Sequence, residues 1–120
     1  MYIKKILQIS KDDNEADIIV SDGVFDILCY VNPLVAIATN SRIISIYGFM
    51  CTDVYRTDKQ VDSVEKLPEY YAYRIIGKIF SKAEHIIQIG EIMIHIDSEI
   101  PNDMEDGEYV SVKVLRFDAF

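Results

Sequence analysis

The chain has 120 residues and a mass of 13.8 kDa, half of its residues are hydrophobic, and its formal net charge is −8. This size and apolar content suit a single domain over residues 1–120, and no apolar run reaches the roughly 20 residues of a membrane-spanning helix. The apolar stretch Ile6–Ile9 is too short for a signal-peptide core, so we expect a cytoplasmic protein that binds no membrane, and the negative charge disfavours nucleic acid.

Short runs of isoleucine and valine predict β-strands, because β-branched side chains pack well on a pleated surface. The first run, Tyr2–Ile9, predicts a strand, although it also suits the start of a short helix. A hairpin is predicted next, with arms at Glu15–Ser21 and Val24–Val31. The pair Asp22-Gly23 between the arms supplies the positive φ angles of a tight turn.

The middle of the chain predicts one strand and one long loop. Arg42–Phe49 is apolar on both faces and predicts a central strand. The stretch Cys51–Glu69 is polar and irregular, so we expect a loop there. Within this loop, Asp62–Leu67 fits a single helical turn that ends before Pro68.

The second half predicts a long antiparallel strand pair. Its arms are Tyr70–Phe80 and His85–Asp97, joined by a four-residue loop. Gly77 and Gly90 lie inside these arms, where glycine usually marks a bulge or a sharp bend. Two bent strands favour closure of the sheet into a barrel.

A turn followed by a terminal strand is predicted over Asp106–Phe117, where Val110, Val112 and Val114 alternate with polar or larger side chains. The glycine-bearing hairpin followed by the acidic DGEYV start of this strand resembles OB-folds and related small barrels, over residues 70–117. The resemblance implies an all-β fold, a small antiparallel OB-like barrel of about six to seven strands. The turn at 62–67 would stand in for the short helix of that fold.

No catalytic or metal site is predicted. Cys29 and Cys51 have no CxxC or Cys/His spacing. His85 and His95 share one predicted arm and are expected to be surface residues, and no nucleophile motif is present. The acidic segment 97–108 does not match the spacing of a calcium loop, so we expect a solvated charged loop. The sequence therefore predicts a non-enzymatic protein without cofactor.

The acidic segment suggests a role in protein interaction. It holds six carboxylates and no Lys or Arg, and we expect it to form a charged rim beside an aromatic anchor at Tyr70–Tyr73. Negative charge steers association with basic partners, as in bacterial immunity or inhibitor proteins against basic nucleases. An exposed strand edge would also permit a homo-oligomer. The predicted partner-binding residues are Tyr70, Tyr71, Tyr73, Asp103, Glu105, Asp106 and Glu108.

The alternative hypothesis is single-stranded nucleic-acid binding, in which tyrosines stack on bases and arginines contact phosphates. The residues for this alternative are Tyr55, Arg56, Tyr73 and Arg74. The net charge of −8 disfavours it, because affinity for nucleic acid depends on neutralising phosphates. A small-molecule pocket inside the barrel is a third hypothesis.

Overall fold

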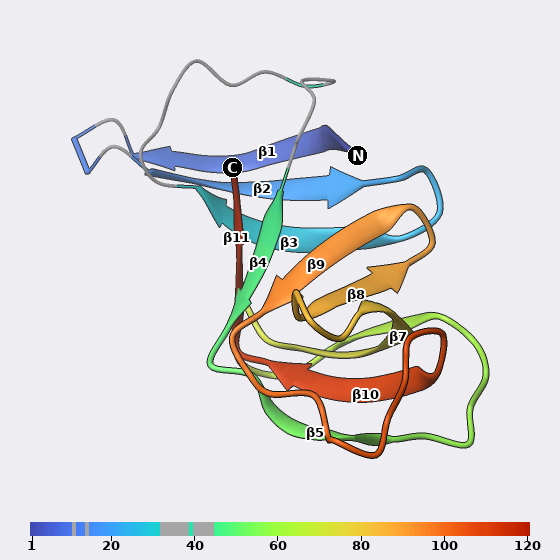
Figure 1. Ribbon diagram of the computed structural model, residues 1–120. Helices are drawn as coiled ribbons and strands as arrows, with labels where there is room; N and C mark the ends of the chain where they lie inside the picture. The colour runs from blue at the N-terminus through green and yellow to red at the C-terminus, as the bar shows by residue number, and fades with distance from the viewer. Residues whose placement is uncertain (11, 14, 32–38, 40–44) are drawn as a thin grey trace.

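The computed structural model of the protein describes residues 1–10, 12–13, 15–31, 39 and 45–120, and this part of the chain forms eleven β-strands and no α-helix (Figure 1). The all-β fold class is thereby confirmed. The strands are β1 (Tyr2–Ser10), β2 (Glu15–Ser21), β3 (Asp26–Val31), β4 (Ile46–Phe49), β5 (Thr52–Arg56), β6 (Ser63–Lys66), β7 (Tyr73–Ser81), β8 (Ile86–Ile89), β9 (Ile92–Ile96), β10 (Tyr109–Val114) and β11 (Arg116–Ala119).

The strands belong to one mostly antiparallel sheet with the order β1-β2-β3-β11-β4-β9-β8-β7-β10-β5, and β6 pairs with β7 off this path. The pairs β11–β3 and β4–β9 are parallel. Figure 1 shows β1–β3 at one end of the molecule and β5, β7 and β10 at the other, with β4 and β11 running between them.

The predicted closed barrel is wrong, because the sheet is open in the described part of the chain and β1 and β5 are its two ends. Neither of the two glycines on which that prediction was based closes a barrel. Gly90 forms a turn rather than a bend, with φ +56°, and Ile89 pairs with Ile92 across it. Gly77 allows a close strand approach, since a Cβ there would lie 2.5 Å from the Gln88 carbonyl oxygen.

The predicted arm 85–97 is consequently two strands, β8 and β9, paired with each other across the Gly90 turn. A run of alternating isoleucines looks the same along one long strand and along two short ones. The turn occurs at Gly90-Glu91 because the left-handed backbone there costs glycine little.

The loop predicted over 51–69 contains two strands, β5 and β6, and the helical turn over 62–67 is wrong. β6 pairs with the start of β7, with Val64 opposite Ile75 and Glu65 opposite Arg74. β5 lies along β10, with Tyr55 opposite Ser111. A four- or five-residue segment has little preference of its own, so the free edges of β7 and β10 decide its conformation.

The hairpin across Asp22-Gly23 is confirmed, with Gly23 at φ +97°. Its loop has four residues rather than two, because β3 begins at Asp26. The Asp22 carboxylate closes the loop by accepting the N–H groups of Val24 and Phe25 at 2.9 and 2.8 Å. The strand predicted over Tyr2–Ile9 is also confirmed, as β1.

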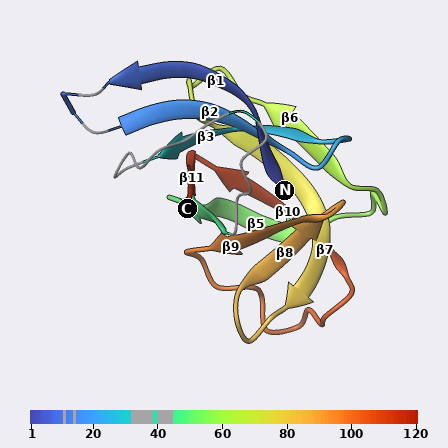
Figure 2. The ribbon, with the colours of Figure 1, turned by 90° about the horizontal axis from the view of Figure 1, so that it is seen from above.

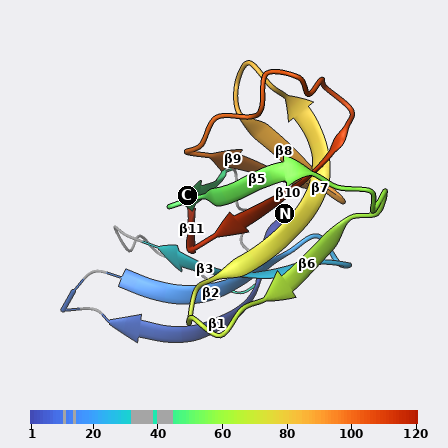
Figure 3. The same ribbon diagram turned by 90° about the horizontal axis from the view of Figure 1, so that it is seen from below.

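The strand predicted over 42–49 is confirmed as β4 where the chain is described, and its residues 42–44 lie outside the described part. Figure 2, seen from above, shows β1, β2 and β3 side by side. Figure 3, seen from below, shows β7 crossing in front of β2 and β3, and the Tyr73 hydroxyl at its start accepts the Leu28 N–H of β3. Buried side chains from β2, β3, β7, β9 and β10 form one cluster, so the open sheet curls round a common core.

Candidate functional site

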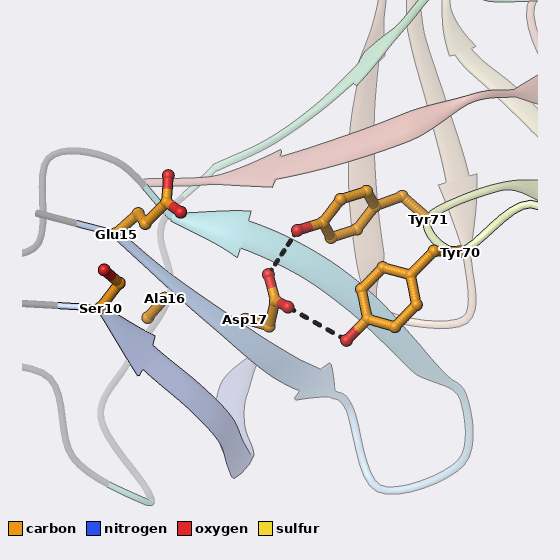
Figure 4. Close-up of a pocket in the computed structure, with 6 residues that line it drawn as sticks. All are labelled: Ser10, Glu15, Ala16, Asp17, Tyr70 and Tyr71. Carbon is orange, nitrogen blue, oxygen red and sulfur yellow. Dashed lines mark hydrogen bonds between the residues drawn. The ribbon is translucent and has the colours of Figure 1, made fainter. Parts of the chain in front are cut away.

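Two tyrosines and an aspartate form a hydrogen-bonded cluster at a pocket between β2 and the turn before β7 (Figure 4). The Tyr71 hydroxyl donates to Asp17 Oδ1 at 2.6 Å, and the Tyr70 hydroxyl donates to Asp17 Oδ2 at 3.0 Å. Asp17 is only 8% exposed, whereas Tyr70 is 55% exposed. Each oxygen of the buried Asp17 carboxylate therefore accepts one hydrogen bond, and the tyrosines that donate these bonds cover it from the solvent side.

The turn before β7 positions both tyrosines. The Leu67 N–H donates to the Ala72 carbonyl at 2.9 Å, and the Ala72 N–H donates to the Glu69 carbonyl at 3.1 Å. These bonds close the turn, so that Tyr70 and Tyr71 project toward β2 with their ring centroids 4.7 Å apart, edge to face. This arrangement is favourable for aromatic pairs.

A second carboxylate lies at the same pocket. Glu15 Oε2 accepts the Tyr30 hydroxyl at 2.6 Å, two residues before Asp17 on β2. The pocket has a volume of about 310 Å³. We name it the tyrosine–carboxylate pocket, and it is lined by Ser10, Glu15, Ala16, Asp17, Tyr70 and Tyr71.

The tyrosines of the pocket are held as proton donors. Burial and then the hydrogen bond to Asp17 raise the pKa of Tyr71. The hydrogen bond to Asp17 likewise raises the pKa of Tyr70, with a smaller contribution from burial. Both hydroxyls therefore stay protonated at neutral pH and keep donating to the carboxylate.

A row of aromatic side chains and one arginine continues from the pocket across four neighbouring strands, β3, β11, β4 and β9. The register places Tyr30 and Tyr47 opposite the same residue of β11, and His95 opposite Tyr47. Arg116 of β11 lies opposite Phe49. Residues directly opposite each other share one face of a sheet, here the face turned away from the core.

Arg116 links the two halves of this row. Its guanidinium carbon lies 4.8 Å from the Tyr30 ring centroid and 5.9 Å from that of Phe49. Asp118 fixes it with two hydrogen bonds, of 2.7 and 3.0 Å. On the pocket side, Tyr71 packs edge-on against Tyr30 with centroids 6.1 Å apart. A cation between two rings is stabilised by both of them.

The row ends at β9. Tyr47 is stacked on Phe49 at 6.5 Å and on His95 at 4.5 Å, measured between ring centroids. Phe120 packs edge-on against Tyr47 at 5.3 Å. We name the whole row the aromatic strip, and it comprises Tyr71, Tyr30, Arg116, Phe49, Tyr47, His95 and Phe120.

Of the predicted tyrosine anchors, Tyr70 and Tyr71 lie together at the pocket, and Tyr73 does not. Tyr73 is 7% exposed, and its hydroxyl accepts the Leu28 N–H at 3.0 Å. Its ring packs against buried Phe117. Tyr73 therefore joins β7 to β3 inside the fold.

The predicted acidic residues are largely engaged within the protein. Arg56 contacts Asp103 at 3.5 Å and Glu108 at 3.4 Å. Asp106 Oδ1 accepts the Lys82 N–H at 2.8 Å, and Glu108 Oε2 accepts the N–H of Glu105 at 2.6 Å. These carboxylates close the loop before β10.

The expectation that the acidic segment lies beside the tyrosine anchor is wrong for Glu108 and Tyr73. Glu108 directly precedes β10, whereas Tyr73 pairs with Val114 at the other end of that strand. The length of β10 separates them by roughly 17 Å. Because β7 and β10 are antiparallel, the acidic loop that precedes β10 lies near the end of β7, whereas Tyr73 lies at the start of β7.

The residues of the nucleic-acid hypothesis are partly brought together. The Arg74 guanidinium carbon lies 5.3 Å from the Tyr55 ring centroid. Arg56 instead contacts the acidic loop, and Tyr73 is buried. A second pair that the sequence did not indicate, Lys78 over Tyr109 at 5.6 Å, lies on the same β10–β7 face as Arg74.

The two cysteine side chains add no reactive group. Burial raises the pKa of the Cys29 thiol. Burial, helped by the Asp97 carboxylate and opposed by a hydrogen bond from the Asp97 backbone, raises the pKa of the Cys51 thiol to about 12. Neither is a thiolate at neutral pH. Within the described residues, no three His, Cys, Asp or Glu side chains are grouped so that they could hold a metal ion.

No family model, curated protein or solved structure matches this chain. Over the described part of the chain, no helix has the length and apolar character needed to cross a membrane.

The sequence predicted Tyr70 and Tyr71 as site residues and did not indicate the others. Asp17 carries a weak signal, a charged residue between Ala16 and Ile18 in a strand that is otherwise buried. The aromatic strip carries none, because Tyr30, Tyr47 and His95 come from strands far apart in the chain.

Proposed function

We propose that this protein is a non-enzymatic, cytoplasmic binding module whose partner is another protein, and that the aromatic strip is its interface. The observation that carries the proposal is the unbroken contact of aromatic rings and one arginine from Tyr71 to His95. Tyrosine and arginine are the residues that most often dominate binding energy at interfaces.

The charge of the chain supports a basic partner. A net charge of −8 raises the rate of encounter with a positively charged surface. A module of this kind would suit the role of an inhibitor or immunity protein, in which a small acidic domain covers a basic one.

The experiment compares two matched variants. The partner is captured from the native cell on immobilised protein, identified, purified and then titrated. Tyr47→Ala should weaken its binding about 30-fold, as expected for an interface tyrosine worth about 2 kcal/mol. Tyr55→Ala is the control, because Tyr55 is an exposed tyrosine outside the strip. A partner that is lost with Tyr55→Ala but retained with Tyr47→Ala would contradict the proposal.

A second candidate is single-stranded nucleic-acid binding on the outer face of β5, β10 and β7. The pairs Arg74–Tyr55 and Lys78–Tyr109 favour it, because each combines a cation with a ring on which a base can stack. Titration of a labelled oligothymidylate at low salt tests it. Binding that falls with Tyr55→Ala and with added salt would support this candidate, and no binding at low salt would dismiss it.

A further inference from the structure

We infer that the tyrosine–carboxylate pocket takes a cationic group with N–H donors, a guanidinium or a primary ammonium, from the partner's basic side chain. The inference rests on the proposed function for the source of the cation. The chemistry itself comes from the pocket, where two carboxylates and two tyrosine rings line one cavity of about 310 Å³.

Among the described residues, no basic side chain compensates the carboxylates of the pocket. Neither Glu15 nor Asp17 has an ion pair with Lys or Arg among the residues that the structure describes. Their hydrogen-bond donors in that part of the chain are the neutral hydroxyls of Tyr30, Tyr70 and Tyr71. A carboxylate taken out of water gains most from an opposite charge, so a cation is the ligand that this pocket favours.

The carboxylates also have room to accept further bonds. An ionised carboxylate offers about four acceptor positions. Asp17 receives the two tyrosine hydroxyls and Glu15 receives one. The remaining lone pairs suit the parallel N–H groups of a guanidinium, while the Tyr70 and Tyr71 rings form aromatic walls against which the cation can lie.

Other ligand classes fit less well. An anion would meet two carboxylates and no basic lining residue. A metal ion would find only two acidic side chains, and no metal-binding group occurs in the described part of the chain. A quaternary ammonium could lie against the rings but would give the carboxylates no further donor.

The test is an amide NMR titration of the whole chain with N-acetyl-arginine methylamide. We expect saturable shifts at Glu15, Asp17, Tyr70 and Tyr71, similar shifts with butylammonium, and none with the neutral N-acetyl-glutamine methylamide. Equal shifts with the neutral probe, no shifts with either cation, or the same shifts with calcium chloride would each overturn the inference.

Variants locate the binding. Asp17→Asn should weaken the arginine probe about tenfold or more, and Asp103→Asn, which removes the same charge elsewhere, should leave it unchanged. Asp17 is buried, so Glu15→Gln at a half-buried side chain serves as a second variant, with a weaker loss expected. Equal losses for Asp17→Asn and Asp103→Asn would contradict a local site.

The same titration separates this inference from the proposed function. Tyr47→Ala lies at the far part of the strip and should leave binding of the arginine probe unchanged. If the probe does not bind, while capture of the partner still depends on Tyr47, the pocket inference fails and the binding module stands. If the probe binds and Tyr47→Ala does not change binding of the partner, the pocket inference stands and the proposed interface fails.

Discussion

The acidic loop before β10 and the tyrosine–carboxylate pocket use the same side chains in different ways. In the loop, Asp106 and Glu108 accept backbone N–H groups, and Arg56 contacts Asp103 and Glu108. In the pocket, Glu15 and Asp17 receive only tyrosine hydroxyls from the described residues. The loop carries more carboxylates, and the pocket is the place where we propose that a partner's cation binds.

The difference teaches that the density of carboxylates in a sequence does not locate a binding site. Carboxylates in a tight loop are often consumed by the loop's own N–H groups, which makes them part of the fold. The number of acidic residues is therefore less informative than the donors that each one already has. Four expected effects, given from the largest to the smallest, distinguish carboxylates that stabilise the fold from carboxylates that could bind a partner.

Gly90→Ala should lower the free energy of unfolding by about 3 kcal/mol, through the left-handed backbone and the loss of a hydrogen bond. A Cβ at Gly90, where φ is +56°, would lie 2.4 Å from Asp22 Oδ2, the atom that accepts the Glu91 N–H. Urea denaturation measures the change. Gly107→Ala is the control, because φ is +91° there and nothing lies within 4 Å of the added Cβ. Equal losses would show that the Asp22 contact is unimportant.

Asp22→Ala should lower the free energy of unfolding by about 2 kcal/mol, because it leaves backbone N–H groups of two turns without their acceptor. The three donors are Val24, Phe25 and Glu91, each within 2.9 Å of the carboxylate. Thermal and urea unfolding check the prediction. A loss no larger than that of Asp103→Ala would place Asp22 with the surface carboxylates instead.

Stability should fall in acid. Burial would raise the pKa of Asp22, but the N–H groups of Glu91, Phe25 and Val24 outweigh burial and hold this pKa below its usual value of 3.8. The pKa of Asp97 is lowered in the same way by the N–H groups of Cys51 and Met50, against burial. A lowered pKa stabilises the fold above the unfolded value and loses that contribution as pH falls through the folded one.

Urea unfolding at a series of pH values from 7 down to about 3 measures this dependence. The Asp22→Ala variant should show a shallower loss of stability below about pH 4 than the parent chain, since it lacks one of the titrating groups. An unchanged slope in that variant would contradict the assignment.

Asp103→Asn should change the free energy of unfolding by no more than about 0.5 kcal/mol, because its contact with Arg56 is long and solvent-exposed. The same substitution should leave both partner capture and the arginine probe unaffected. A clear loss of partner binding in this variant would show that the acidic loop, and not the pocket, belongs to the interface.

Local patterns predicted much of the fold and little of the site. The Asp22-Gly23 turn, β1 and β10 follow from residues that are close in sequence. The single terminal strand predicted up to Phe117 is wrong, because the chain divides there into β10 and β11. β5 and β6 could not be predicted, because their pairing partners lie in β10 and β7 and their own sequences are polar. Tyr70 and Tyr71 were predicted as anchors, but their partner Asp17 is more than fifty residues away along the chain.

By itself, the sequence determined an acidic, all-β domain with its strong turns in place, because β-branched runs and Asp-Gly pairs act over a few residues. Only the tertiary structure decided that the sheet is open, that Gly90 turns the chain, and that Tyr30, Tyr47 and His95 share one face. Strand order depends on which edges meet during packing round the common core. That choice is non-local, and the site depends on it.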